Sequence, residues 1–287
     1  MGKITKLTLY TDLIPTDTIV QGIVSDLHYI PGMDNTHLNQ IKQEMTGINC
    51  ILWPGDLIDD ASYLRDKKIK QEFQDTLYNF SKGKQNIVSY GNHDLMEKDK
   101  DGIWRPSDKR LIKDTLTEIG FTVLENGEKI TTDGIEYSAL SPDFYYYEDK
   151  TKPKKRRESP EDYKKLFDEY YNPELFSKNH YSILLTHEPQ SIIRLSKELG
   201  KCIQPNTNLV LSGHMHNGMT PNFLPLPRNR GIISPQYQPL PTYAKGIKTV
   251  DKTTFFINGP TNAMVGNDLA NNLIGANAGI VTLRKTR

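Results

Sequence analysis

The chain has 287 residues, and its 36 Lys and Arg side chains are balanced by 35 Asp and Glu side chains, which leaves a formal net charge of +1. This balance disfavours a dedicated duplex-DNA binder, because such proteins need a broad basic face against the phosphate backbone. Hydrophobic residues make up 36% and charged residues 25%, as in a folded globular protein rather than a fibrous or disordered one.

The lack of recognisable targeting signals and the small number of cysteines exclude further classes of protein. The sequence contains no apolar run near the roughly 20 residues that a membrane span needs. Its first residues lack the apolar region and the small-residue cleavage site of a signal peptide. Two cysteines, Cys50 and Cys202, are too few for a disulfide framework or a thiolate metal site. We therefore expect a cytoplasmic protein that forms a single domain over residues 1–287.

Short apolar or β-branched runs with Gly, Pro or Asn nearby predict eight strands. In chain order they cover residues 18–24, 48–53, 86–90, 135–140, 181–186, 208–212, 253–258 and 279–283. Apolar residues at three- and four-residue spacing predict helices over 34–45, 62–80, 107–119 and 189–199. Strands and helices alternate in the first half, which predicts βαβ units, and the strand-rich second half predicts a second sheet.

Two segments depart from this pattern. Residues 143–160 form a basic and aromatic insertion, with three consecutive tyrosines at 145–147 and six basic residues among the eight at 150–157. Residues 221–248 contain six prolines and are predicted to be a loop. We interpret the basic run as a solvated loop. The alternatives are a mobile cationic lid over an anionic substrate and peripheral contact with an acidic lipid surface.

Five polar clusters follow predicted strands directly. They contain Asp26 and His28; Gly55 and Asp56; Gly91, Asn92, His93 and Asp94; His187; and Gly213, His214 and His216. In open α/β sheets the binding crevice lies outside the carboxyl ends of the strands, so all five clusters are expected to converge there. Each cluster alone has an ordinary structural explanation, such as a turn or a helix cap. All five together, in order, favour a functional site.

The residue types in these clusters are metal ligands. Asp26 and His28 are two residues apart, as are His214 and His216, and alternate residues of an extended segment point to the same side. Imidazole together with carboxylate suits Mn, Fe or Zn better than Ca. The candidate donors are Asp26, His28, Asp56, Asn92, His187, His214 and His216. Seven donors are too many for one tetrahedral ion and fit two metals that share a bridging carboxylate.

These blocks resemble the five motifs of the calcineurin-like metallophosphoesterases, which are Asp-x-His, Gly-Asp-x-x-Asp, Gly-Asn-His-Asp/Glu, an isolated His and Gly-His-x-His. The resemblance extends from Val24 to His216. It implies an α/β fold of four layers, an αββα sandwich in which two mixed β-sheets are flanked by helices. It also implies two divalent metal ions at the strand ends.

The resemblance assigns a role to each motif position. It implies that one metal is held by Asp26, His28 and His216, that the second is held by Asn92, His187 and His214, and that Asp56 bridges the two. It further implies that His93 contacts the substrate phosphate and protonates the leaving oxygen, and that Asp94 orients His93.

Departures from the motifs indicate a branch of the family. Asp59 occupies the position of the metal-binding tyrosine of purple acid phosphatases, and the Arg-Gly that follows this motif in Ser/Thr protein phosphatases is missing. The Pro-rich segment resembles the bacterial phosphodiesterase-type branch, although Met215, Asn217 and Met219 differ from the usual residues of that branch.

We therefore expect a dinuclear-metal-dependent phosphoesterase that favours diesters, in which a metal-bridged hydroxide attacks phosphorus and His93 is the general acid. The alternatives are a phosphomonoesterase, a nuclease and a non-catalytic binding module that kept the fold. The expected partner is a small phosphate ester, either nucleotide or lipid-linked, and not duplex DNA. Residues 104–106, Trp-Arg-Pro, follow the His93 motif by ten residues and agree equally well with the mouth of a site and with ordinary surface packing.

Overall fold

The computed structural model describes residues 3–144, 146, 165, 168–170, 172–200, 204–221, 230–235, 239–262 and 276–286. The basic run at 150–157 therefore lies outside the described residues, and so do most of the 143–160 insertion and parts of the 221–248 segment. Within the described ranges, no helix is both long enough and apolar enough to cross a lipid bilayer.

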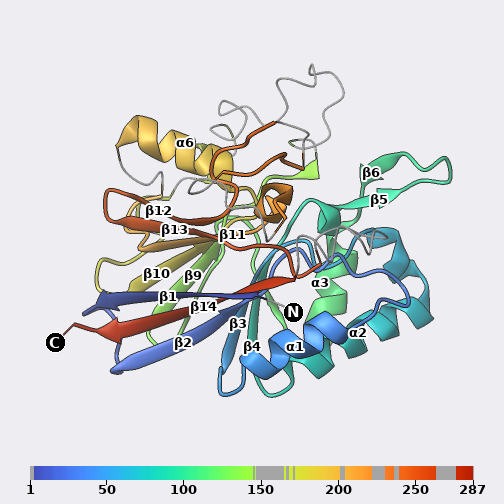
Figure 1. Ribbon diagram of the computed structural model, residues 1–287, viewed down its shortest axis with the longest axis horizontal. Coiled ribbons are helices and arrows are strands. Elements are labelled where there is room, and N and C mark those ends of the chain that lie inside the picture. Colours follow the sequence, from blue (N-terminus) through green and yellow to red (C-terminus); the bar gives the residue numbers. More distant parts are fainter. Residues whose placement is uncertain are drawn as a thin grey trace.

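Two six-stranded sheets, both mixed, form the centre of the fold (Figure 1). The first contains, in spatial order, β1 (Lys3–Thr11), β14 (Asn277–Lys285), β2 (Thr18–Ile23), β3 (Cys50–Pro54), β4 (Gln85–Ser89) and β7 (Thr122–Val123). Strands β2, β3, β4 and β7 are parallel to one another, whereas β14 runs antiparallel to β2. The carboxyl ends of β2, β3 and β4 therefore lie at one edge of this sheet.

The second sheet has a similar parallel centre. Its strands, in spatial order, are β12 (Gly246–Val250), β13 (Thr253–Ile257), β11 (Leu209–Ser212), β10 (Tyr181–Leu185), β9 (Ile135–Ala139) and β8 (Lys129–Thr132). Strands β13, β11, β10 and β9 are parallel, and the two outer strands are antiparallel to their neighbours.

Helices cover the outer faces of both sheets. The first sheet is covered by α1 (Thr36–Glu44), α2 (Lys67–Ser81) and α3 (Lys109–Thr117), and α6 (Pro189–Leu199) lies over the second (Figure 1). Short 3-10 helices η1 (Ala61–Arg65), η2 (His93–Leu95) and η4 (His216–Met219) and a hairpin of β5 (Met96–Lys98) and β6 (Trp104–Pro106) occupy the connections. The Asp66 carboxylate caps α2 by accepting hydrogen bonds from two amides of its first turn.

Strand alternation builds three apolar layers. Leu52 of β3 belongs to the core between the sheets, whereas its neighbours Ile51 and Trp53 belong to the core beneath the helices. In the second sheet, Ile183 and Leu185 belong to the core between the sheets, and the core beneath α6 includes the intervening Leu184. These two central strands thus bury both faces, as expected for strands enclosed between layers. The four-layer αββα architecture predicted from the sequence is confirmed.

All eight predicted strands and all four predicted helices are present, with bounds that differ by a few residues, and the helix predicted over 62–80 is divided into η1 and α2. Six strands were not predicted: β5, β6, β7 and β8, which have two to four residues each, and the longer β1 and β12. Strand β1 has mainly Lys and Thr on its exposed positions and lies at a sheet edge, so its sequence lacks an apolar run. Strand β12 lies at the end of the predicted 221–248 loop and extends beyond it, because the last proline is Pro241 and the amides from Gly246 onward can pair with β13.

Candidate metal centre

The five polar clusters come together at the carboxyl ends of strands from both sheets. The loop after β2 continues beside the loop after β3, because Asp26 N donates to Gly55 O at 3.1 Å and His28 N donates to Asp56 O at 3.0 Å. The clusters after β4, β10 and β11 complete the site. Candidate ligands from the first sheet therefore face candidate ligands from the second.

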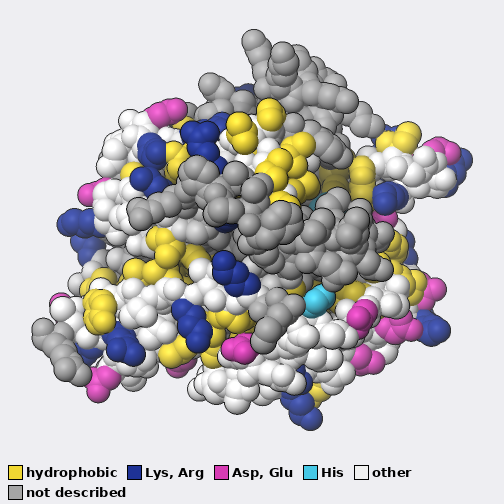
Figure 2. All heavy atoms as spheres, viewed as in Figure 1, with side chains coloured by type: hydrophobic (Ala, Val, Ile, Leu, Met, Phe, Trp, Pro, Cys, Tyr) yellow, Lys and Arg dark blue, Asp and Glu magenta, His cyan; other side chains and the backbone are white. Residues whose placement is uncertain are grey.

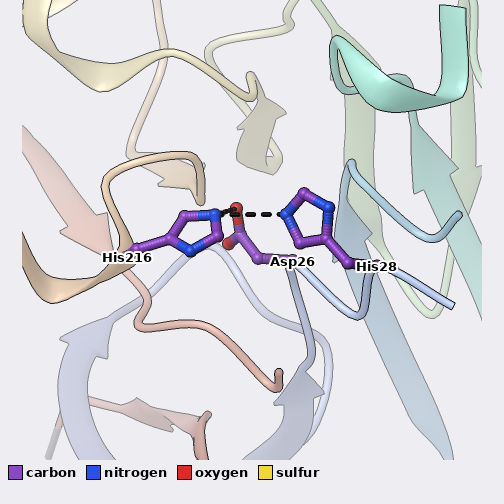
Figure 3. Close-up of side chains that lie close together, drawn as sticks. All are labelled: Asp26, His28 and His216. Atoms are coloured by element: carbon purple, nitrogen blue, oxygen red, sulfur yellow. Dashed lines mark hydrogen bonds and ion pairs between the residues drawn. The ribbon is translucent and has the colours of Figure 1, made fainter. Parts of the chain in front are cut away.

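One group of side chains consists of Asp26, His28 and His216, whose ligand atoms lie within 4.8 Å of one another. Nε2 of His216 is 3.4 Å from Oδ1 of Asp26 and 3.1 Å from Nε2 of His28. Figure 3 shows a ring nitrogen of His216 and one of His28 turned toward one another, with the Asp26 carboxylate between the two rings in this view. This convergence of one carboxylate and two imidazoles is a suitable half-site for a divalent transition metal.

A second group consists of Asp56, His187 and His214, also within 4.8 Å. Nε2 of His187 lies 3.0 Å from Oδ2 of Asp56, and the same oxygen lies 3.5 Å from Nε2 of His28, which belongs to the first group. Asp56 is thus the carboxylate between the two groups, the position that a bridging ligand requires.

Buried polar atoms without partners show that these residues fit cations. Among the described residues, Oδ1 of Asn92 and Oδ2 of Asp26 are buried and accept no hydrogen bond. An unsatisfied buried acceptor is costly, and a cation bound beside each of these atoms would satisfy it. Asn92 follows β4 beside Asp56, since the next amide, that of His93, donates to Oδ1 of Asp56 at 2.8 Å. The main chain directly after Asn92 therefore contacts Asp56, a member of the second group.

The electrostatics of the site also favour cations. Burial tends to raise the pKa of Asp26, but its hydrogen bond with His216 and the nearby imidazoles lower that pKa to about 2. Burial tends to lower the pKa of His187, but Asp56 and Asp26 raise it to about 10. The carboxylates thus draw a proton onto His187 in the absence of another positive charge. A divalent cation supplies that charge and competes with the proton.

Main-chain strain is concentrated in the candidate ligands. Five of them have φ in the left-handed region, which non-glycine residues seldom adopt. They are Asp26 (52°), His28 (44°), Asp56 (56°), His214 (68°) and His216 (46°). Such residues cost free energy and persist where the surrounding structure holds them, most often at functional sites.

Two glycines allow the loops to approach one another closely. A Cβ atom at Gly91 would overlap the carboxylate and the amide of Asp56, and a Cβ at Gly213 would lie 2.5 Å from Oδ2 of Asp26. The glycines of the Gly-Asn-His-Asp and Gly-His-Met-His clusters are therefore required for the ligands to pack together.

Two of the imidazoles are oriented by contacts of the ring nitrogen that does not face the other candidate ligands. Nδ1 of His187 lies 2.8 Å from the carbonyl oxygen of Pro54, which leaves Nε2 directed at Asp56. The Asp59 carboxylate lies 3.4 Å from Nδ1 of His28. Contacts of this kind set the tautomer and orientation of metal-binding imidazoles.

The structure places Asp94 differently from the expected orienting partner of His93. The Asp94 carboxylate accepts hydrogen bonds from the amides of Asp56, Leu57 and Gly91, each at 2.8 Å, and so joins the loops after β3 and β4. Nδ1 of His93 instead lies 2.6 Å from the carbonyl oxygen of Asp59 and 3.4 Å from its carboxylate. The reason is the 3-10 turn η2, which turns consecutive side chains in different directions.

Asp59 is thus a site residue that the sequence analysis did not assign. The available signal was the second aspartate of Gly-Asp-x-x-Asp, four residues after Gly55. The His93 side chain is 22% exposed, whereas those of His28 and His187 are 4% and 0% exposed. His93 is therefore the more accessible imidazole at the rim of the buried candidate ligands.

Comparisons with known proteins identify the family of this chain. The family model for calcineurin-like phosphoesterases matches residues 21–218. A search of curated proteins finds no match. Similar solved structures include a dimetal phosphatase from Danio rerio, with 10% sequence identity, a TM-score of 0.41 and coverage of 84% of this chain and 87% of that one.

Two further structures share 12% identity with this chain, with a TM-score of 0.43, and each match covers 93% of this chain and 54% of the other. They are a 5'-nucleotidase precursor from Thermus thermophilus and the purple acid phosphatase PPD1 from yellow lupin. The family model spans well over half of the chain, and its range includes the five clusters at the strand ends. This chain belongs to the calcineurin-like phosphoesterase family.

Proposed function

We propose that this protein is a dinuclear-metal-dependent phosphoesterase that hydrolyses diesters in preference to monoesters. The observation that carries the proposal is the position of Asp56, whose carboxylate lies between two groups of carboxylate and imidazole ligands. Two cations that share one carboxylate can act together on a single phosphoryl group.

The ligand assignment follows the two groups. Asp26, His28 and His216 would hold one divalent cation, Asn92, His187 and His214 would hold the other, and Asp56 would contact both. When bound, two divalent cations lower the pKa of water and neutralise charge on the phosphoryl oxygens. The mixture of imidazole, carboxylate and amide oxygen suits Mn, Fe or Zn.

His93 is the proposed general acid. Its Nδ1 faces the Asp59 carbonyl, so that Nε2 is the nitrogen available to exchange a proton with the substrate. The ring centroid lies 4.5 Å from that of His28, which places His93 directly beside the ligand group that contains His28. An alkoxide leaving group needs a proton, and a partly exposed imidazole at this position can provide it.

The preference for diesters rests on the sequence. An aspartate at position 59 in place of tyrosine, together with the missing Arg-Gly, separates this chain from two well-known groups of monoesterases. A small phosphate ester is the expected substrate. On the face shown in Figure 2, the coloured Lys and Arg side chains are scattered among other residue types. The net charge of +1 supports a small ligand over duplex DNA.

Hydrolysis of a chromogenic phosphodiester and of the matching monoester, with Mn and again after chelation, tests the proposal. We expect chelator-sensitive cleavage, faster for the diester. Faster cleavage of the monoester would agree with the proposed metal centre, but it would mean that the protein is a phosphatase and not a diesterase. If the protein cleaves neither ester and binds no metal, the proposed enzymatic function is wrong, and a non-catalytic binding module is favoured.

A further inference from the structure

A hairpin stands immediately next to the proposed general acid. Strands β5 and β6 follow His93 closely in the chain and return it to α3, and the hairpin projects from the body of the molecule (Figure 1). Its strands pair antiparallel, with Lys98 opposite Trp104 and Glu97 opposite Arg105. These two pairs point to opposite faces of the hairpin.

One face of the hairpin carries an aromatic side chain against His93. The Trp104 ring meets the His93 ring edge to face, with a centroid distance of 5.5 Å and an interplanar angle of 82°. Nζ of Lys98 lies over the Trp104 ring, 4.5 Å from its centroid. The indole is partly exposed, although an indole usually gains stability from complete burial. Its place at the rim of the site gives it an available apolar surface beside the imidazole.

The base of the hairpin is anchored on the loop that carries the candidate ligands. The Asp60 carboxylate accepts a hydrogen bond from the amide of Lys98 at 3.2 Å. On the opposite face, the Arg65 guanidinium forms bidentate hydrogen bonds with the Glu97 carboxylate, and the shortest of them joins Nη2 to Oε2 at 2.8 Å. Ser107 N donates to Leu95 O at 2.9 Å and closes the base. The position of Trp104 relative to His93 is therefore built into the fold rather than left to a freely moving loop.

We propose that Trp104 is a specificity-determining residue that binds the leaving group, and that the substrates are phosphoesters whose alcohol portion carries an aromatic ring. The inference rests on the proposed function, because a group that receives its proton from His93 departs past that imidazole. The first part of the leaving group then lies within reach of an indole whose centroid is 5.5 Å from the His93 ring. An aromatic ring gains offset or edge-to-face contact with the indole, which an alkyl group of equal size does not.

The test compares two phosphoesters that differ only in one alcohol group. One carries a benzyl group, and the other carries a cyclohexylmethyl group, which has similar bulk but no aromatic ring. The pair is prepared as diesters or monoesters, whichever class the Mn-loaded enzyme cleaves. We expect Trp104→Leu to lower kcat/KM for the benzyl ester about tenfold and for the cyclohexylmethyl ester less than about twofold, the size of one lost aromatic contact. Trp104→Phe should restore most of the benzyl preference. For each ester, kcat/KM of a variant is compared with kcat/KM of the wild type, so the difference in intrinsic reactivity between the two esters does not affect the result.

Arg105→Gln is the matched control on the same hairpin. The Arg105 side chain is 56% exposed, pairs with Asp99 at 3.0 Å, and lies on the face away from Trp104. This variant should leave kcat/KM for both esters within about twofold of wild type, as expected for an exposed surface ion pair. Equal losses for both esters in Trp104→Leu would overturn the proposal, because they would mean that Trp104 merely positions His93. Unchanged values for both esters would overturn it as well.

A binding measurement separates this inference from the catalytic proposal. The protein has two tryptophans, and Trp53 is completely buried, so acrylamide quenches chiefly the fluorescence of Trp104. We expect benzylphosphonate to protect Trp104 of the Mn-loaded protein from quenching at lower concentration than cyclohexylmethylphosphonate does. If the protein cleaves no ester, this preference alone upholds the aromatic subsite while the proposed function fails. Equal protection by the two phosphonates would overturn the subsite.

Discussion

At the scale of single residues, side-chain position separates the candidate ligands from the candidate acid. Five of the seven candidate ligands have strained main-chain φ angles, whereas His93 is partly exposed and its Nδ1 contacts Asp59. Asp59 contacts both His28 and His93, and so links one candidate ligand to the candidate acid. We expect substitution of His93 to separate transfer of a proton from binding of metal.

Replacement of His93 tests this separation. We expect His93→Ala to lower kcat by about 100-fold to 10,000-fold, the usual contribution of general acid catalysis, while both metals remain bound. Elemental analysis of the variant against wild type gives the metal content, and steady-state rates give kcat. Normal turnover in His93→Ala would remove the general-acid role, and a loss of one metal would make His93 a ligand instead.

The surroundings of Cys50 suppress the nucleophilic reactivity of its thiol. It lies in the core between the sheets, and burial, followed by the nearby charge of Asp133, raises the pKa of its thiol to about 12. A thiol with a raised pKa stays neutral at pH 8, and only the thiolate is nucleophilic. Peptide mass spectrometry after iodoacetamide treatment at pH 8 should therefore find Cys50 unmodified in the native protein and modified in urea. Modification in the native state as fast as that of glutathione would contradict this picture.

At the scale of elements, the loops after β3 and β4 are joined around Asp56. The Asp94 carboxylate binds amides of both loops, and Gly91 leaves the space that the Asp56 carboxylate occupies. The His93 amide donates a hydrogen bond to Oδ1 of the Asp56 carboxylate. The orientation of the candidate bridging ligand therefore depends on close contact of two loops.

Substitution of Gly91 tests that dependence. Gly91→Ala should displace Asp56 and lower the metal content at both positions, because the added Cβ overlaps the bridging carboxylate. Gly83→Ala is the control: it strains the backbone through its φ of 76°, but no atom lies within 4 Å of the added Cβ. The control should cost about 1 kcal/mol of stability and retain its metals. Equal metal content in both variants would contradict the proposed packing.

At the scale of the whole molecule, the candidate centre joins the two sheets. Asp26, His28, Asp56 and Asn92 follow strands of the first sheet, and His187, His214 and His216 follow strands of the second. Between the sheets the contacts are mainly apolar, formed by side chains such as Leu52, Ile183 and Phe256. Metal ions at the shared edge would add direct bonds between the two halves.

Chelation should therefore lower thermal stability. A ligand that binds only the folded state stabilises it by about 2.7 kcal/mol at 100 times its Kd. At about 2–4 °C per kcal/mol for a domain of 150–250 residues, removal of two metals should lower Tm by about 10 °C or more. Differential scanning calorimetry with Mn and with EDTA gives the change, and Asp56→Asn should reduce it. A Tm that does not respond to EDTA in a protein shown to hold metal would contradict the bridging role.

Much of the fold could be predicted from local signals. The strands next to the site are runs of apolar or β-branched residues buried on both faces, so their sequences predict them directly. Strand β1 escaped prediction because its main stabilisation comes from pairing with β14, near the other end of the chain, and not from its own apolar content.

The sequence by itself determined the chemistry of the candidate site, because ligand type and two-residue spacing are local properties that survive without knowledge of the fold. Only the tertiary structure decided which groups meet. It placed Asp59, not Asp94, against His93, because the η2 turn directs the Asp94 carboxylate onto backbone amides. It likewise brought Trp104 to His93 through the pairing of β5 with β6. Such contacts depend on loop dihedral angles and on packing between loops, which residue order alone does not specify.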